Sequence, residues 1–248
     1  MREQKAVPSE APVASAKPAA EPVVPAPTPT PTAPPAQEAK PKKVASDCPK
    51  TDPVSFPSAD FEAAVRLKLQ KPTGDISRAD LKRLHSLNLV NVSLSELDVC
   101  LFPHMTGLKE LFLGKGDYSD LSPISGATGL ESLRASLNKV SDLRPLSKLT
   151  KLDRLDLGHT EVTDLSPIAS LTNLTELMLD DTQVADLAPL SGMKLLERLS
   201  IQRTKVAKVP DLKDLKKLKF VYVTGTPADE DPTSWAPFRR VGAKIVNQ

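Results

Sequence analysis

The sequence predicts an α/β solenoid, with a parallel β-sheet on its concave face and short helical or 3₁₀ turns on its convex face. The first observation behind this prediction is a leucine that returns every 22 positions, at Leu108, Leu130, Leu152, Leu174, Leu196 and Leu218. The second is the phrase shared by these units, Leu-x-x-Leu-x-Leu-x-x-Thr/Asn-x-Val-x-Asp-Leu-x-Pro-Leu. The third is an aromatic content of only 4%, which fits an aliphatic core of stacked units better than a conventional globular core.

A single unit is too small to bury its own apolar residues. Leu152, Leu155 and Leu157 have the spacing of a short strand, whereas Val162 and Leu165 follow no long helical or strand period. Stacking neighbouring units at about 4.8 Å turns the strands into a parallel sheet and the leucines into one continuous core. We therefore expect stability to arise between nearest-neighbour repeats.

The repeat phrase resembles the leucine-rich repeat. It is similar to the 22-residue bacterial form found in internalin-like surface proteins, a form that also occurs in a eukaryotic phosphatase regulator. The resemblance implies a leucine-rich repeat solenoid that presents a binding surface. It does not identify the ligand, because solenoids share their leucines and differ in what they bind.

Changes of composition divide the chain into four segments. They are a disordered Pro/Ala-rich linker over residues 1–47, a helical N-terminal cap over 48–83, about seven repeats over 84–226, and a C-terminal cap over 227–248. The linker holds 11 of the 24 prolines and is expected to populate polyproline II. It is read as a spacer; the alternative is a ligand for a PxxP-reading domain, through Pro22 to Pro25 and Pro31 to Pro34.

The N-terminal cap is expected to contain two helices. Phe61, Val65 and Leu69 share one helical face after Ser58, which is a plausible cap, and Ser77-x-x-Asp80 opens a second short helix. This segment also resembles the helical cap that precedes the repeats of internalin-like proteins. At the other end, Trp235 and Phe238 are expected to cover the last repeat, with a final strand around Ile245.

Two cysteines lie on either side of the cap. Cys48 precedes it and Cys100 belongs to the irregular first repeat, so the two can meet at the N-terminal end of the solenoid. Either they form a disulfide, which requires an oxidising compartment, or they remain free thiols. No Cys/His spacing of the zinc type occurs, and we expect neither a metal nor a cofactor.

Two polar rows recur in the repeats and are interpreted as structural. Asp120, Asp142, Asp164 and Asp186 each precede a proline by three positions, as capping carboxylates do. A second row is expected to satisfy main-chain groups where the chain leaves the sheet, and it consists of Asn138, Thr160, Thr182, Thr204 and Thr226.

The variable positions of the strand phrase are expected to face outward from the concave face. Aromatic and Arg side chains in adjacent columns are typical anchors of protein interfaces. The candidate binding residues are Phe112, Arg134, Arg154, Asp156, His159, Met178, Asp181, Arg198, Arg203 and Tyr222. The alternative is a solvated face with scattered apolar residues, in which Arg154 and Arg198 simply pair with Glu176.

Catalysis and nucleic-acid binding are both disfavoured by the sequence. His159 can approach Asp156, Asp180 and Asp181, but a catalytic site also needs a concave pocket, and this face should be open and shallow. Residues 194–219 carry nine basic and three acidic residues, without a nucleic-acid-binding motif or suitably spaced aromatics, and are interpreted as a solvated basic edge.

The sequence thus favours a monomeric, non-enzymatic module that binds a protein through its concave face. We expect it at a bacterial cell envelope, in the periplasm, anchored to the outer membrane or secreted, with membrane contact only through an N-terminal anchor such as a lipid. No apolar run approaches the length of a membrane span. The alternative is a cytoplasmic adaptor or regulatory subunit of an enzyme such as a phosphatase.

Overall fold

The computed structural model describes residue 46 and residues 48–247. The described residues all belong to one compact unit within Lys43–Gln248. The Pro/Ala-rich segment predicted to be a linker, with its two PxxP matches, lies outside the described residues apart from Ser46. In the part of the chain that the structure describes, no helix is both long and apolar enough for a membrane crossing.

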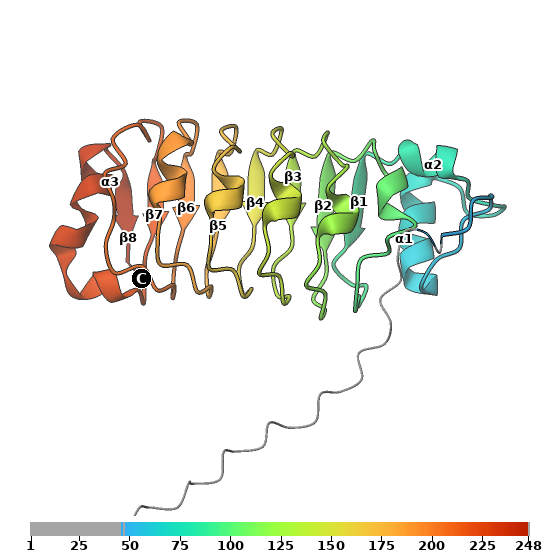
Figure 1. The fold of residues 1–248 in the computed structure, drawn as a ribbon, viewed down its shortest axis with the longest axis horizontal. Coiled ribbons are helices and arrows are strands. Elements are labelled where there is room, and N and C mark those ends of the chain that lie inside the picture. Colours follow the sequence, from blue (N-terminus) through green and yellow to red (C-terminus); the bar gives the residue numbers. More distant parts are fainter. Residues whose placement is uncertain (1–45, 47, 248) are drawn as a thin grey trace, which may run out of the picture. The chain divides into compact units, whose positions relative to one another are not determined.

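Eight short strands form one parallel sheet in sequence order, which confirms the predicted solenoid (Figure 1). Each strand has three or four residues. The segment after each strand returns the chain to the end of the sheet at which all the strands begin. The strands are β1 (Ser86–Leu89), β2 (Glu110–Leu113), β3 (Ser132–Arg134), β4 (Arg154–Asp156), β5 (Glu176–Met178), β6 (Arg198–Ser200), β7 (Phe220–Tyr222) and β8 (Lys244–Val246).

The sheet register follows the repeat length. Glu110 lies opposite Ser132, 22 positions later, and this shift holds through Phe220. The first step is longer, because Ser86 pairs with Glu110 across the irregular first repeat. A given repeat position therefore occupies the same place on every strand from β2 to β7.

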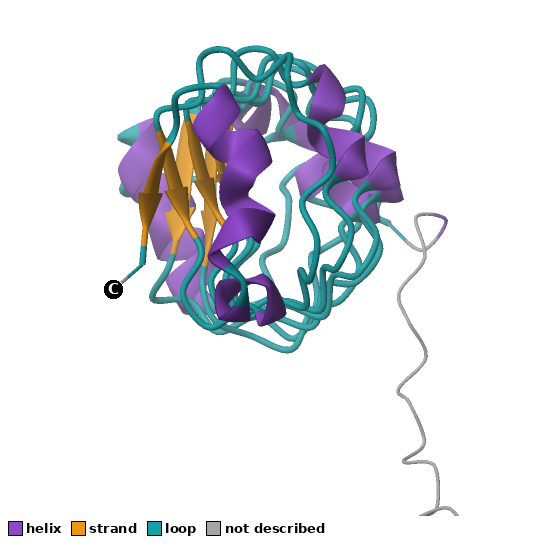
Figure 2. Ribbon diagram, turned by 90° about the vertical axis from the view of Figure 1, so that its left-hand side faces the viewer, coloured by secondary structure: helices purple, strands orange, loops and turns teal. Residues whose placement is uncertain are grey.

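Short 3₁₀ turns lie opposite the sheet in every coil from β1 to β6, as the end-on view shows, whereas the described residues between β6 and β7 form none (Figure 2). Asp164 Oδ1 accepts a hydrogen bond from the Ser166 N–H at 2.8 Å, and the other three aspartates of the row make the same contact two residues ahead. Each aspartate thus accepts a main-chain N–H, as expected, but it lies one residue before the N-cap of the turn, which is a leucine. The turns are η2 (Phe102–His104), η3 (Ser122–Ile124), η4 (Arg144–Leu146), η5 (Ser166–Ile168), η6 (Ala188–Gly192), η7 (Pro227–Glu230) and η8 (Pro232–Trp235).

The Thr/Asn row forms a buried ladder with one exception. The hydroxyls of Thr160, Thr182 and Thr204 each donate to the carbonyl oxygen three residues earlier, at 2.6–2.7 Å. The Asn138 amide donates to two main-chain carbonyls. The expectation is wrong for Thr226, whose buried hydroxyl has no hydrogen-bond partner among the described residues.

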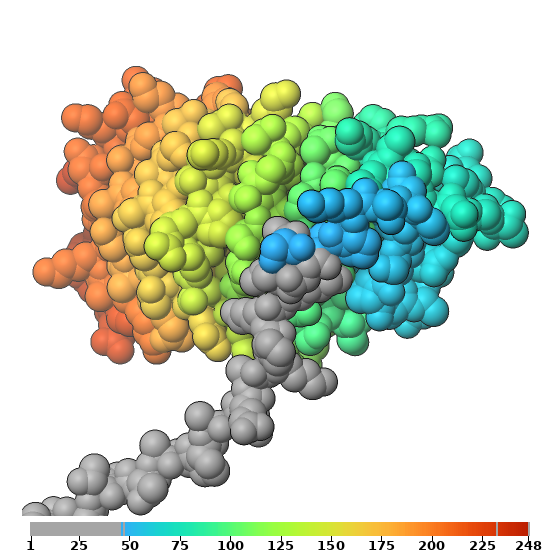
Figure 3. Space-filling view, turned by 45° about the vertical axis from the view of Figure 1, so that its right-hand side comes forward, coloured from blue at the N-terminus to red at the C-terminus, as the bar shows by residue number. Residues whose placement is uncertain are grey.

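The N-terminal cap contains helix α1 (Ala59–Leu69), which lies at the first-strand end of the sheet (Figure 1). In the space-filling view, the blue and cyan atoms of this part of the chain lie together at one end of the repeats (Figure 3). Ser58 Oγ accepts from the Phe61 N–H at 3.2 Å, which confirms the predicted cap residue. Phe61 and Val65 are fully buried, so this face of the helix closes the open end of the leucine core.

Helix α2 (Arg78–Lys82) follows, with the capping box predicted from Ser77-x-x-Asp80. A disulfide joins Cys48 to Cys100, whose Cα atoms lie 5.3 Å apart. Because 52 positions separate the two cysteines, the bond ties the segment before α1 directly to the irregular first repeat.

The C-terminal end is closed by helix α3 (Ala236–Arg240) and strand β8. Trp235 and Phe238 are buried and stack with their ring centroids 6.1 Å apart. Ile245 pairs with Val221 of β7. The aromatic pair therefore covers the last repeat, as predicted, and β8 adds one more strand to the sheet.

Candidate protein-binding surface

The solvent-facing side chains of β1–β8 form a continuous surface, hereafter the sheet face. The register places Phe112, Arg134, Asp156 and Met178 in one row across β2 to β5. Strand side chains alternate between the two sides of a sheet, so the leucines between these positions point into the core. The repeat thus fixes the placement of this row, while its chemistry varies from repeat to repeat.

A shallow depression of about 180 Å³ lies in the sheet face over β2 to β5. Phe112 and Met178 are half-buried and supply its apolar side chains, whereas Arg134 and Arg154 are exposed. It is lined by Glu110, Phe112, Ser132, Leu133, Arg134, Arg154, Leu155, Asp156, Glu176 and Met178. Five of the ten candidate binding residues therefore come together here.

Two residues that line the depression form a cross-strand ion pair. Arg134 Nε lies 3.2 Å from Asp156 Oδ2 and donates to Ser136 Oγ at 3.1 Å. Asp156 Oδ1 accepts from the Gly158 N–H at 3.0 Å. Each of the two side chains has a second hydrogen-bond partner, so the pair is fixed in position. A partly exposed pair of this kind adds only about 0–1 kcal/mol to stability.

Arg154, Glu176 and Arg198 form a second row of charged side chains, and one of its two expected ion pairs is not made. Arg198 Nη1 contacts Glu176 Oε1 at 3.2 Å, as expected. Arg154 does not complete the series: its Nε lies 3.6 Å from Asp153 Oδ2, on the neighbouring residue of its own chain segment. The Asp153 carboxylate also accepts a hydrogen bond from Thr175, so Arg154 has a long, shared contact and stays exposed.

Three other candidate residues form a charged ladder just after the strands. His159 Nε2 lies 3.3 Å from Asp181 Oδ2, and Arg203 donates to both oxygens of Asp181, at 2.5 and 2.7 Å. The hydrogen bond from Arg203 lowers the pKa of Asp181 and raises the pKa of Arg203 itself. The ladder crosses three repeats but does not line the depression.

The left-handed backbone conformation at this repeat position was not predicted from the sequence. Leu137, His159, Asp181 and Arg203 all have left-handed conformations, with φ between 52° and 63°. The available signal was Gly225, which occupies the same repeat position with φ of 74°, a region that glycine enters without steric cost. A repeat position that is occupied by glycine in one of the units indicates a tight turn at that position in the others.

Tyr222 lies at the far end of the sheet face. It is half-buried on β7, opposite Ser200 on one side and Val246 on the other. It does not line the depression, so the structure leaves it apart from the group around Phe112.

The described residues contain no group of three His, Cys, Asp or Glu side chains that could hold a metal ion. The carboxylates near His159 all have other partners. Asp156 binds Arg134 and Gly158, Asp180 accepts from Ser200 and Gln202, and Asp181 binds Arg203 as well as His159. This arrangement suits a surface of fixed charges better than acid/base chemistry.

Comparison with known proteins supports the repeat assignment. The family model for leucine-rich repeats in two copies matches residues 128–170 and 150–192. A crystal structure of an internalin, InlF, from Listeria monocytogenes is 27% identical, with a TM-score of 0.64, and the match covers 78% of this chain and 57% of that one. The chain thus spans little more than half the length of that relative.

Two further solved structures share the fold. Internalin C2 from Listeria monocytogenes is 23% identical with a TM-score of 0.58, and the match covers 78% of this chain and 94% of that one. A leucine-rich repeat protein of Leptospira interrogans is 20% identical with a TM-score of 0.54, covering 69% and 51%. No curated protein matches by sequence. The repeat phrase and the stacked sheet make the chain a leucine-rich repeat solenoid, and the comparisons show that it is similar to bacterial internalins.

Proposed function

We propose that this chain is a non-enzymatic module that binds a partner protein through the depression in its sheet face. The observation that carries the proposal is the pairing of two half-buried apolar side chains, Phe112 and Met178, with the exposed guanidinium of Arg154 in one depression. Large apolar and Arg side chains surrounded by polar groups are the usual composition of interface hot spots.

The exposed guanidinium of Arg154 favours a partner that brings an acidic group to this point of the depression. Arg134 and Arg198 are neutralised by Asp156 and Glu176 at 3.2 Å each, whereas Arg154 has only the 3.6 Å contact with Asp153. An incoming carboxylate would therefore meet a cation that is not already engaged at short range. Such a contact would set partner choice and association rate more than affinity.

The disulfide supports display outside the cytoplasm. Cys48 and Cys100 are joined, and disulfides persist mainly in oxidising compartments such as the periplasm or the extracellular space. We therefore place the module at the bacterial envelope or outside the cell. A cytoplasmic adaptor would keep the two thiols reduced.

The test is affinity capture from envelope and cytoplasmic fractions with three baits. They are the unaltered chain, Phe112→Ala combined with Arg154→Glu, and Lys148→Glu as a matched charge reversal on an exposed residue outside the sheet. Equal urea midpoints would first establish that all three baits fold alike. We expect a protein from the envelope fraction to be retained by the unaltered and Lys148→Glu baits and lost by the double variant.

Equal capture by all three baits would refute the depression as the binding site. If the double variant does lose the partner, a Tyr222→Ala bait measures how far along the sheet face the interface extends. Because Tyr222 lies outside the depression, its loss should weaken capture less than the double variant does.

A further inference from the structure

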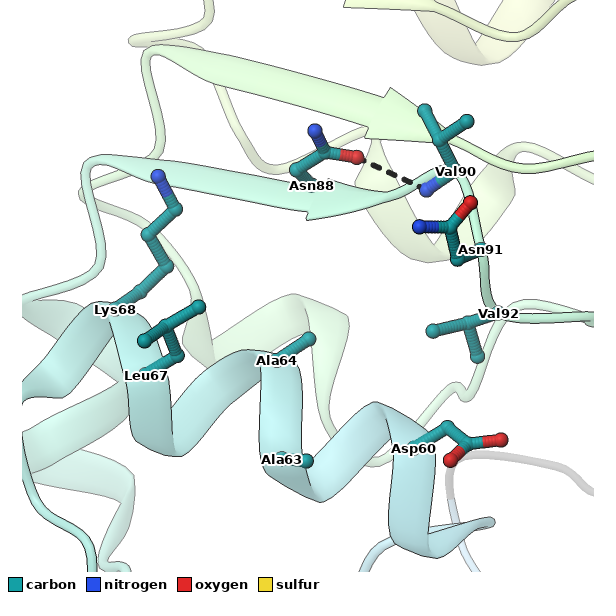
Figure 4. A pocket seen from close by; sticks show the side chains of 9 residues that line it. All are labelled: Asp60, Ala63, Ala64, Leu67, Lys68, Asn88, Val90, Asn91 and Val92. Atoms are coloured by element: carbon teal, nitrogen blue, oxygen red, sulfur yellow. Dashed lines mark hydrogen bonds between the residues drawn. The ribbon is translucent and has the colours of Figure 1, made fainter.

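A second hollow lies between helix α1 and the first strand (Figure 4). It adjoins the sheet-face depression, because its lining residue Asn88 pairs with Phe112 of the next strand. Its volume is about 560 Å³, within the range of roughly 300–1,000 Å³ that ligand pockets occupy. We call it the cap groove, and it is lined by Asp60, Ala63, Ala64, Leu67, Lys68, Asn88, Val90, Asn91 and Val92.

Two apolar side chains in the cap groove are exposed without a packing reason. Leu67 is 77% exposed and Val90 is 43% exposed, and only one other large apolar side chain in the described residues, Leu137, is comparably exposed. On the same helix, Phe61 and Val65 already close the core. Leu67 therefore does not serve the cap, and clustered exposed apolar residues mark interaction sites.

The strand side of the cap groove can recognise a peptide main chain. Strand β1 is the first strand of the sheet, so among the described strands it has a neighbour on one edge only. Asn88 and Asn91 are exposed beside it. Asn88 Oδ1 already accepts a hydrogen bond from the Val90 N–H at 3.0 Å, so Asn88 offers its amide donors, whereas the Asn91 amide offers donors and an acceptor. Edge strands with free main-chain groups bind extended segments by strand addition.

A basic and an acidic side chain lie near opposite ends of the cap groove. Figure 4 shows Lys68 near the start of β1 and Asp60 near Val92, beyond the end of the strand. Both side chains are exposed, and the ion pairs found within the described residues involve neither of them. The groove is therefore neutral overall but polar along its length.

We propose that the cap groove binds an extended peptide segment of a partner protein. The segment would place aliphatic side chains against Leu67 and Val90, an acidic residue near Lys68 and a basic residue near Asp60. An anionic surface is disfavoured because Asp60 lines the same hollow.

The experiment selects phage-displayed random linear heptapeptides on the full chain, followed by affinity measurements on the synthetic winners. Leu67→Glu tests the apolar wall. Its matched control is Leu137→Glu, the same substitution at an exposed leucine in a repeat, outside the cap groove. We expect selected peptides to share alternating aliphatic residues between an acid and a base, and to bind Leu67→Glu at least about tenfold more weakly than Leu137→Glu.

A charge variant sharpens the assignment. Selection on Asp60→Lys should yield peptides that keep the aliphatic pattern and the acidic residue but lose the basic one. Peptides that bind Leu67→Glu and the unaltered chain equally, or no enrichment at all, would overturn the proposal. So would a concentration-dependent dimer, seen by sedimentation, that Leu67→Glu abolishes, because the occupant would then be a second copy. None of these results depends on Phe112 or Arg154.

Discussion

Ser77 and Asp80 exchange hydrogen bonds across the first turn of α2. The Ser77 N–H donates to Asp80 Oδ2 at 3.0 Å, and the Asp80 N–H donates to Ser77 Oγ at 3.2 Å. Lys71 Nζ reaches the same carboxylate oxygen at 3.0 Å. The main-chain donor of Ser77 and then the Lys71 ammonium lower the pKa of Asp80 from 3.8 to about 2.

This pKa predicts how the cap responds to acid. Because the pKa of Asp80 is lower in the folded than in the unfolded chain, the ionised carboxylate stabilises the fold above about pH 4, and this contribution is lost as the pH falls through about 2. Asp80→Asn should lower the free energy of unfolding at neutral pH and flatten its decline in acid. Urea unfolding at several pH values measures both. Parallel pH profiles for variant and parent would contradict the assignment.

The threonine ladder yields a matched pair of substitutions. Thr182→Val removes the donor to the Leu179 carbonyl, made at 2.7 Å, and should cost about 1–3 kcal/mol because a buried acceptor is left unpaired. Thr226→Val removes a buried hydroxyl without a hydrogen-bond partner among the described residues, and should be neutral or stabilising. Urea unfolding of the two variants decides the matter, and equal losses would refute the difference in hydrogen bonding.

The disulfide should contribute strongly to stability. Replacing both Cys48 and Cys100 by serine opens a loop closed across 52 positions, and the chain-entropy relation gives a loss of about 4 kcal/mol. Thermal unfolding with and without a reductant measures the effect. The parent should lose stability on reduction, whereas the double-serine variant should be unaffected by the reductant. A parent that is insensitive to complete reduction would contradict the prediction.

A buried strand leucine and an exposed leucine of helix α1 should differ sharply in their effect on stability. Leu155→Ala, at a fully packed strand position 1% exposed, should cost about 2–5 kcal/mol. Leu67→Ala, at 77% exposure, should change stability by less than about 0.5 kcal/mol. Chemical unfolding compares them directly. A large loss for Leu67→Ala would give that residue a structural role and remove the reason for assigning it to a ligand.

The sheet could be predicted in detail because its register is set by the repeat length. Once Leu111, Leu133, Leu155 and Leu177 are assigned to the core, each following residue must face solvent, and the row from Phe112 to Met178 follows. The aspartate row and the Ser77 box were equally predictable, because their contacts are local in sequence.

Features that depend on side-chain conformation or on the placement of distant elements were not predictable in the same way. Arg154 can reach Glu176 or Asp153 from the same backbone position, and the sequence does not decide between them. The cap groove requires α1 to stand beside β1 with Leu67 turned outward. The core-facing pattern of Phe61 and Val65 predicts the helix but not the hollow that it leaves.

The Cys48–Cys100 bond also determines how the molecule carries tension. A pull on the chain before Cys48 passes through the bond into the first repeat and does not load the backbone between the two cysteines, which includes α1 and α2. The cap helices are thereby shielded, and the force reaches the leucine core directly. For a protein held by its N-terminal side while gripping a partner, peeling of the cap is then suppressed, and reduction of one covalent bond would restore it.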